Sequence, residues 1–253
     1  MLMRYAVSIA LVAAVSTGTA FSADSAAMKV PAYIQSAVSD SSRPEKDRQR
    51  DANREPAKVL AFAGVKPGQK IMELFPSRGY YTRLLCRVAG PSGHVYAMDL
   101  KEKDPNAESN HTNIPPECKN TTGDNQPAGA PNFPSDLDVV WTTENYHDLK
   151  DDYWAGGIPD TKSFDAAIFK SLKPGGVFIV EDHVAEAGSG ARDTATLHRI
   201  DPDLVKQELT SVGFVFAGES KVLHHADDDH KAKVFTLKGN SDRFLFKFRK
   251  PAA

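Results

Sequence analysis

The sequence contains little of what marks the specialised classes of protein. It has only two cysteines in 253 residues, Cys86 and Cys118, which excludes a disulfide-dense scaffold, and their spacing does not resemble a zinc site. They form either one disulfide or two thiols, and sequence separation alone does not decide between these alternatives. Internal repeats and sustained heptads are also absent, so the sequence predicts neither a solenoid nor a coiled coil.

Charge is balanced along the chain. There are 31 Lys and Arg residues and 33 Asp and Glu residues, which leaves a formal net charge of −2. Because no basic surface favours a phosphate-backbone partner, we expect no nucleic-acid partner. The 41% apolar and 25% charged composition is ordinary for a soluble globular protein.

The N-terminus has a composition of its own. Its apolar run, residues 6–15, is about half as long as a bilayer-spanning helix, so we expect no stable membrane anchor. The run follows Arg4, and Gly18 and Ala20 place small side chains at the two positions that a signal peptidase inspects. This pattern predicts a signal peptide over residues 1–20 and a periplasmic or secreted protein. No cysteine comes directly after this apolar run, which excludes a lipid-modified cysteine at that position.

Two regions follow the predicted signal peptide. Residues 21–47 are rich in Ser, Ala and charge and contain Pro31 and Pro44, which indicates a linker or N-terminal extension with one weak helix, outside the core. Residues 48–251 are long enough for one substantial core, so we expect one main domain there.

From Arg54 onward, helical and strand patterns alternate, which predicts an α/β protein with a parallel sheet covered by helices. Helices are expected over 56–63, 81–88, 160–172 and 202–212, and strands over 70–75, 94–98, 138–141, 177–181, 214–216 and 244–249. The last two strands suit an antiparallel edge. A third strand is expected within the polar segment 100–134, at a position that no periodicity reveals.

The first strand, its loop and the next strand form the most informative unit. The loop Pro76–Gly79 follows the first strand, and Asp99 ends the second, 20 residues after Gly79. Ligands of open parallel sheets bind beyond the carboxyl ends of the strands, where a carboxylate at this spacing binds ribose. The alternative is that Asp99 caps a strand or turn.

The chain resembles a bacterial family of predicted class I methyltransferases, many of them exported. The motifs that carry the resemblance are residues 66–68, 73–82, 96–99, 145–148, 172–176, 182–183, 197–202, 226–230, 242–244 and 247–251. It covers residues 43–251 and implies a three-layer class I methyltransferase (Rossmann-like) fold. That fold has a mostly parallel seven-stranded sheet with an antiparallel last strand, and its cofactor is S-adenosyl-L-methionine.

One motif departs from the family. The family loop is similar to Pro-Gly-Gly-Gly, whereas this chain has Ser77 and Arg78 in place of two glycines. A Cβ at a position of positive φ is costly, and an arginine side chain can fill the space of the cofactor. Alternatively, Arg78 points outward or pairs with the cofactor carboxylate.

The resemblance also implies a set of cofactor-binding residues. Glu73 and Gly79 approach the methionine part, Asp99 accepts hydrogen bonds from the ribose hydroxyls, and Asp124 lies near the adenine. The rest of the expected set is Arg54, Phe75, Ser77 and Tyr81. Arg50 is a further candidate for binding a carboxylate, and the alternative for it is an ordinary charged face.

Candidate catalytic residues follow two later strands. Methyl transfer needs an aligned nucleophile and, for some acceptors, a base. His147, with Asn145 and Tyr146, is the first candidate, and Asp182 and His183 are the second. Each histidine is otherwise a hydrogen-bonded structural residue.

The histidines raise the question of a metal. His147, Asp182, His183 and His198 can converge on one, but they lack a diagnostic close spacing, so we predict no metal site. His224, His225 and His230 are expected in a solvated loop.

Three classes of function follow. The first is an exported methyltransferase acting on a small-molecule substrate of unknown identity. S-adenosylmethionine is made in the cytoplasm, which motivates the second, a non-catalytic exported binding protein in which Ser77 and Arg78 have closed the cofactor loop. The third is a metal-assisted hydrolase or lyase that uses the His and Asp cluster. The sequence leaves the oligomeric state open.

Overall fold

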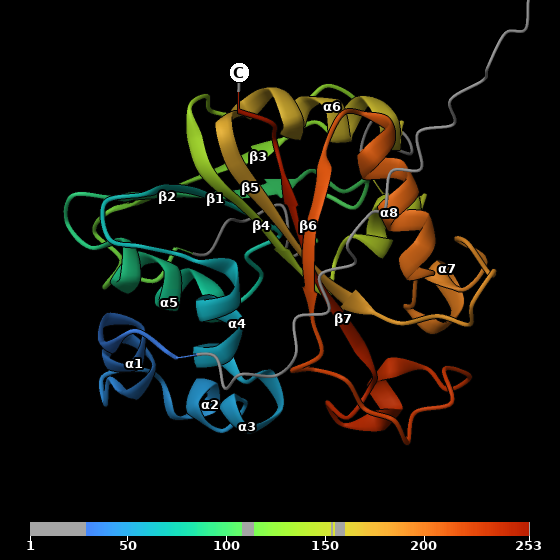
Figure 1. The fold of residues 1–253 in the computed structure, drawn as a ribbon, viewed down its shortest axis with the longest axis horizontal. Helices are drawn as coiled ribbons and strands as arrows, with labels where there is room; N and C mark the ends of the chain where they lie inside the picture. Colours follow the sequence, from blue (N-terminus) through green and yellow to red (C-terminus); the bar gives the residue numbers. More distant parts are fainter. Residues whose placement is uncertain (1–28, 108–113, 153, 155–159, 253) are drawn as a thin grey trace, which may run out of the picture.

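The computed structural model describes residues 29–107, 114–152, 154 and 160–252. Its centre is a seven-stranded sheet in the order β3-β2-β1-β4-β5-β7-β6 (Figure 1). The strands are β1 Lys70–Leu74, β2 His94–Leu100, β3 Thr121–Gln126, β4 Leu137–Thr143, β5 Leu172–His183, β6 Val215–Ser220 and β7 Arg243–Arg249. β7 pairs antiparallel with both β5 and β6, whereas the pairs among β1 to β5 are parallel. The predicted fold class is confirmed.

Helices cover both faces of the sheet. The α-helices are α1 Ala32–Ser39, α2 Glu45–Arg48, α3 Asp51–Arg54, α4 Pro56–Ala63, α5 Tyr80–Ala89, α6 Thr161–Ser171, α7 Thr194–Leu197 and α8 Pro202–Ser211, and two 3-10 helices are η2 His147–Lys150 and η3 Val234–Leu237. α1, α4 and α5 lie on one side of the sheet, and α6 and α8 on the other (Figure 1). This arrangement gives the three layers that the sequence predicts.

The two faces are apolar because both are covered. Ile71, Val139 and Ile179 face the core under α4 and α5, and their neighbours Met72 and Val140 face the core under α6 and α8. Alternation of side chains along a strand therefore sends apolar residues to both sides. The charged residues of the central strands therefore lie near the ends of those strands.

The strand that the sequence could not locate is β3. It pairs parallel with β2 from Val95↔Thr121 to Leu100↔Gln126. Its sequence, Thr-Thr-Gly-Asp-Asn-Gln, carries no large apolar side chain and lies at the edge of the sheet. An edge strand that buries little has no hydrophobic alternation to recognise.

The described part of the predicted extension, residues 29–47, enters the core, which corrects the expectation that this segment lies outside it. Ile34 of α1 is completely buried, and Ala37 packs in the same cluster under α4 and α5. Arg43, also buried, binds Asp51 through both terminal nitrogens at 2.7 and 2.8 Å. The predicted signal peptide over 1–20 lies outside the described residues. Within the described residues, no helix combines the length and apolarity needed to cross a membrane.

The two cysteines form a disulfide. Cys86 of α5 is bonded to Cys118, which precedes β3, and both are buried. The bond spans 32 residues of sequence and ties the segment leading to the edge strand to a core helix. It settles the choice between disulfide and thiols that the sequence left open.

Replacing both cysteines, as C86A/C118A, should lower the free energy of unfolding by about 3–4 kcal/mol, because an open chain gains the conformational freedom that the closed loop denies it. Urea unfolding of the two proteins measures the difference. The oxidised wild type and a reduced wild type serve as controls. A double variant as stable as the oxidised protein would contradict the structural role of the bond.

Candidate functional site

Parallel strands bring the polar residues that follow them to one edge of the sheet. β1, β4 and β5 all end there, and α2, α3 and the segment between β6 and β7 lie beyond that edge (Figure 1). Asn53 of α3 donates a hydrogen bond from Nδ2 to the carbonyl oxygen of Lys238 at 3.2 Å, which joins the two sides. Two adjacent cavities open at this edge, the place where open α/β sheets bind ligands.

The smaller cavity, of about 130 Å³, lies against the loop that joins β1 to α5, and we call it the loop cavity. It brings together most of the predicted cofactor-binding set: Arg54, Glu73, Phe75, Ser77 and Tyr81. Asn145 of the predicted catalytic set lines it as well, and the other lining residues are Arg50, Pro76, Arg78, Tyr80, Thr143 and Glu144.

Glu73 is the buried acid of the loop cavity. Glu73 is 3% exposed, and its Oε2 atom has no hydrogen-bond partner within the described residues. Burial raises the pKa of Glu73 to about 7, and the nearby charge of Asp99 adds to the effect. An unpartnered buried carboxylate is costly unless a donor or cation satisfies it, so this atom is suited to a cationic ligand.

Asp99 is the penultimate residue of β2, near enough for its charge to act on Glu73, but it does not line either cavity. It is 4% exposed and accepts a hydrogen bond from the backbone N–H of Leu100 at 3.0 Å. Burial raises its pKa to about 7. The rings of Phe75 and Trp154, both buried, lie with centroids 5.4 Å apart, tilted by 39°, in the core cluster that also includes Met98 and Leu100. Because Asp99 itself is buried, the position predicted to bind ribose is covered by protein in this structure.

The loop between β1 and α5 is strained. Phe75 has φ of 55° and Ser77 has φ of 50°, whereas Gly79, the N-cap of α5, has φ of 76°. A side chain thus occupies a position of positive φ at Ser77, as expected, but Arg78 is not among the residues with positive φ. Gly79 does not line the loop cavity, and a Cβ on it would come within 2.8 Å of Pro115.

The larger cavity, of about 530 Å³, shares Arg50, Arg54 and Glu144 with the loop cavity, and we call it the edge cavity. Its other walls come from α3, from the end of β5 and from the segment that precedes β7. His183 is the member of the predicted catalytic set that lines it. The remaining lining residues are Gln49, Asn53, Val234, Phe235, Lys238, Gly239, Ser241 and Arg243.

A buried ion-pair network separates the cavities from the sheet. Arg243 donates from Nη1 to Glu181 Oε1 at 2.8 Å and to Glu144 Oε1 at 3.0 Å, and Arg54 pairs with the other oxygen of Glu144. Although burial favours the neutral acid, the adjacent arginines Arg54 and Arg243 lower the pKa of Glu144 to about 2. For Glu181, which has no exposed surface, burial outweighs the pull of Arg243 and raises the pKa to about 7.

Sequence reasoning missed this network. Glu144 and Glu181 follow or end apolar strands, and Arg243 begins the last one. Two signals were available in the sequence. One is an acid at the end of a fully apolar strand, and the other is an arginine at the start of the strand that pairs antiparallel with it. Four of the eight described non-glycine residues with positive φ line the cavities, among them Glu144 and Lys238, so backbone strain gathers at this edge.

His183 presents a neutral ring to the edge cavity. Its Nδ1 lies 2.9 Å from the hydroxyl of Ser241, and its Nε2 makes no hydrogen bond to the part of the chain that the structure describes. Burial lowers the pKa of His183 to about 4, so its imidazole is neutral at pH 7. It can exchange a hydrogen bond or a proton with a ligand in the cavity.

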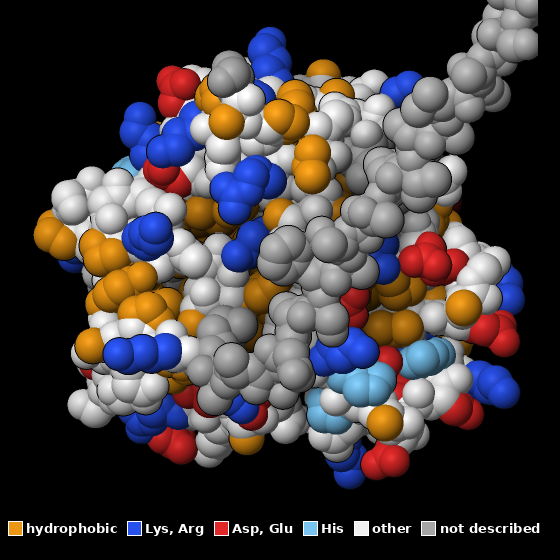
Figure 2. Space-filling model, viewed as in Figure 1, with side chains coloured by type: hydrophobic (Ala, Val, Ile, Leu, Met, Phe, Trp, Pro, Cys, Tyr) orange, Lys and Arg blue, Asp and Glu red, His pale blue; other side chains and the backbone are white. Residues whose placement is uncertain are grey.

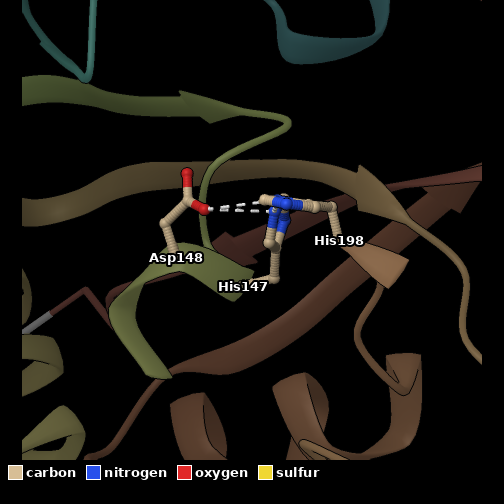
Figure 3. A group of neighbouring side chains, drawn as sticks. All are labelled: His147, Asp148 and His198. Atoms are coloured by element: carbon tan, nitrogen blue, oxygen red, sulfur yellow. Dashed lines mark hydrogen bonds and ion pairs between the residues drawn. The ribbon is translucent and has the colours of Figure 1, made fainter. Parts of the chain in front are cut away.

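His147 lies behind the cavities. Its Nδ1 is 2.8 Å from Asp182 Oδ1, and its Nε2 is 3.1 Å from Asp148 Oδ1 and 3.3 Å from His198 Nδ1. Figure 3 shows one carboxylate oxygen of Asp148 directed at both imidazole rings. Burial disfavours the charged ring, but the carboxylates of Asp182 and Asp148 outweigh it and raise the pKa of His147 well above its usual value.

Three further predicted site residues, in addition to Gly79, Asp99 and His147, lie away from the cavities. The hydroxyl of Tyr146 lies in the core, 2.9 Å from Asp165 and 3.0 Å from Glu208. Asp182 has no exposed surface and accepts hydrogen bonds from the backbone N–H groups of His147 and His183. Asp124 is exposed on β3 and accepts a hydrogen bond from the N–H of Asn125.

The segment between β6 and β7 is held by hydrogen bonds, and its histidines differ in exposure: His224 is exposed, as expected of a solvated loop, whereas His225 and His230 are half-buried. Asp242, 4% exposed, accepts hydrogen bonds from the backbone N–H of His225 and lies 2.9 and 3.0 Å from ring nitrogens of His224 and His230. Arg199, fully buried, binds Asp228. Histidine side chains gather among charged ones on this part of the surface (Figure 2). These contacts hold one wall of the edge cavity.

Solved structures with a similar fold are methyltransferases and a cyclase. The chain is 17% identical to an S-adenosylmethionine-dependent methyltransferase from Aquifex aeolicus, with a TM-score of 0.55 over 82% of this chain and 98% of the other. A methyltransferase of the same kind from Mesorhizobium loti is 15% identical, with a TM-score of 0.52 over 77% and 97%. The (4+2)-cyclase SpnF is 14% identical, with a TM-score of 0.58 over 81% and 83%.

No protein-family model matches the sequence, and no curated protein matches it significantly. The similarity to solved structures establishes the class I methyltransferase fold. It does not establish the reaction, which has to be argued from the cavities.

The ion-pair network makes a prediction about stability. Replacing Arg243 by Met leaves Glu181 and Glu144 buried with fewer positive partners, so R243M should lower the free energy of unfolding by about 3–5 kcal/mol. R249M is the matched control, because Arg249 is an exposed arginine at the other end of the same strand, and it should change stability by about 0.5 kcal/mol or less. Urea unfolding compares the two, and equal effects would contradict the network.

Proposed function

We propose that this chain is an S-adenosylmethionine-dependent methyltransferase that holds the methionine end of its cofactor in the loop cavity and a small, negatively charged acceptor in the edge cavity. The observation that carries the proposal is the contact between two cavities at the carboxyl ends of the strands. They share Arg50, Arg54 and Glu144, so ligands bound in both would lie next to each other. Alignment of two reactants is the largest contribution that a protein makes to such a transfer.

The loop cavity fits the methionine end of the cofactor. That end carries an ammonium group and a carboxylate. Glu73 offers the ammonium a buried oxygen without a partner, and the guanidinium groups of Arg50 and Arg54 line the same cavity for the carboxylate. The cavity thus offers a carboxylate to the ammonium group and guanidinium groups to the carboxylate of a zwitterionic ligand. Bound there, S-adenosylmethionine supplies an electrophilic methyl group.

The nucleoside end fits only after a local change. A cavity of about 130 Å³ is smaller than the ~300–1,000 Å³ of typical small-molecule sites. Asp99 is 4% exposed and lines neither cavity. Binding of the ribose therefore requires the residues around Asp99 to move, whereas Phe75, which lines the loop cavity with a positive φ, is held by its surroundings.

The charge of the edge cavity favours an anionic acceptor. Arg54 and Arg243 are neutralised by Glu144 and Glu181. Arg50 and Lys238 line the same cavity, and neither side chain makes an ion pair with the described residues. Arg50 also lines the loop cavity, where it faces the cofactor carboxylate, so Lys238 is the cation that suits a carboxylate or another small anion as acceptor.

His183 is the predicted catalytic residue best placed to contact the acceptor. Because its pKa is about 4, it is a weak base at neutral pH. A weak base is sufficient for an acceptor whose nucleophilic atom is already ionised, and the neutral ring orients that atom by a hydrogen bond. His147, fixed between Asp182 and His198, does not line the edge cavity.

Calorimetric titration with S-adenosylhomocysteine tests the cofactor site. We expect binding by the wild type and a loss of about 10–100-fold in affinity in E73Q, which removes the carboxylate that faces the ammonium. E219Q is the matched control, because Glu219 is exposed on β6, at the opposite edge of the sheet from β3. Absence of binding by the wild type at millimolar ligand would refute the proposal.

The same titration should depend on pH. Glu73 has a raised pKa of about 7, so its proton must leave before the carboxylate can bind a cation. Affinity should therefore increase with pH up to about 7, by about tenfold per unit for one proton, and level off above it. In E73Q the slope should fall by about one proton, and an unchanged slope would assign the linkage to another group.

We also propose that the chain is exported. The signal-peptide pattern of residues 1–20 motivates this, and the Cys86–Cys118 disulfide supports it, since such bonds persist in oxidising compartments. The mass of the chain recovered from the periplasm or medium should lack residues 1–20. Full-length chain with reduced cysteines, confined to the cytoplasm, would contradict export.

A further inference from the structure

We infer that His147, Asp148 and His198 form a binding site for a divalent transition metal of the zinc type. The three ligand atoms are His147 Nε2, Asp148 Oδ1 and His198 Nδ1 (Figure 3). They come from η2 and from the residue that follows α7, elements that pack against each other. This site does not rest on the proposed methyl transfer.

The distances among the ligand atoms suit a tetrahedral ion. They are 3.1 Å between His147 and Asp148, 3.3 Å between the two imidazoles, and 4.0 Å between His198 and Asp148. Two ligands about 2.0–2.1 Å from a tetrahedral zinc ion lie about 3.3 Å from each other. Small adjustments of side chains would therefore complete the coordination.

The protonation of His147 leaves a lone pair at the centre of this group. The Asp182 carboxylate lies 2.8 Å from Nδ1 and also accepts two backbone N–H groups, so Nδ1 carries the proton and donates it. In the neutral ring, Nε2 then presents its lone pair to a carboxylate oxygen and to another ring nitrogen. With the proton of His198 on Nε2, its Nδ1 is an acceptor as well, and a metal ion between the three atoms accepts a lone pair from each of them.

The residues that contact the three ligands are of the kinds that orient ligands in metal sites. Asp182, with no exposed surface, orients His147, and the side-chain amide of Asn145 donates to Asp148 Oδ2 at 3.1 Å. His198 has a left-handed backbone with φ of 55°, and its ring packs against Phe235 with centroids 4.7 Å apart. A carboxylate behind a ligating imidazole is the usual support in metal sites, and the strained backbone indicates a fixed orientation.

The site is open on one side. The side chain of His198 is 31% exposed and that of Asp148 is 15% exposed, so an ion has a route from solvent. Three protein ligands leave one position of a tetrahedral ion to water. Because Phe235 also lines the edge cavity, the site lies at the back of one of its walls.

Titration with zinc chloride tests the site. The chain is purified without a polyhistidine tag and treated with chelator. We expect one Zn²⁺ per chain at micromolar concentration or below, a higher melting temperature with zinc, and reversal by chelator. H198Q and D148N should each weaken binding by at least about tenfold. H94Q is the matched control, because His94 contacts Thr122 at the start of β2, outside the cluster.

Replacing zinc by Co²⁺ gives a visible absorption spectrum that reports the metal ligands and does not depend on folding alone. Because both cysteines are in the disulfide, a four-coordinate visible spectrum would report nitrogen and oxygen ligands, and it should disappear in H198Q. Melting without metal shows whether each variant is folded. No zinc binding by the wild type, or equal binding by wild type, H198Q and D148N, would overturn the assignment.

Discussion

The structure depends on how charged side chains are accommodated where the central strands end. Both faces of the sheet are covered, so Glu181 cannot reach water and has to be compensated by Arg243, which enters from the antiparallel β7. Arg243 also binds Glu144 and the carbonyl of Asn53 in α3. One guanidinium group thereby holds together the end of the sheet, the helices before the first strand and the boundary of both cavities. Loss of a partner in a buried pair is far more costly than the pair is stabilising.

The fold does not determine the reaction, since proteins of similar structure include a cyclase as well as methyltransferases. The distribution of charge is more informative. Glu73 has one oxygen, Oε2, without a partner in a cavity that also has arginines, whereas Glu144 of the edge cavity is neutralised by Arg54 and Arg243 and Lys238 makes no ion pair with the described residues. A zwitterionic ligand and an anionic one therefore fit two adjacent places. The cluster of His147, Asp148 and His198 lies behind them and serves neither ligand directly.

Local signals in the sequence predicted the fold well. Pro56 and Gly64 mark a helix that runs from Pro56 to Ala63, and apolar runs mark the central strands. The polar strand β3 and the helix α1 gave no comparable pattern, because β3 buries few side chains and α1 buries only Ile34 and Ala37. The site was harder. Glu73 and Tyr81 could be found from the first loop, but the burial of Asp99 and the partners of His147 depend on contacts between distant segments.

The central claim is that a cofactor occupies the space between Glu73 and Asp99. A crystal structure of the chain with S-adenosylhomocysteine tests it most directly. We expect the ligand ammonium within hydrogen-bonding distance of Glu73, and the ribose hydroxyls on an Asp99 carboxylate that the protein no longer covers. A ligand bound elsewhere, with Asp99 still buried and Glu73 Oε2 still without a partner, would contradict the claim.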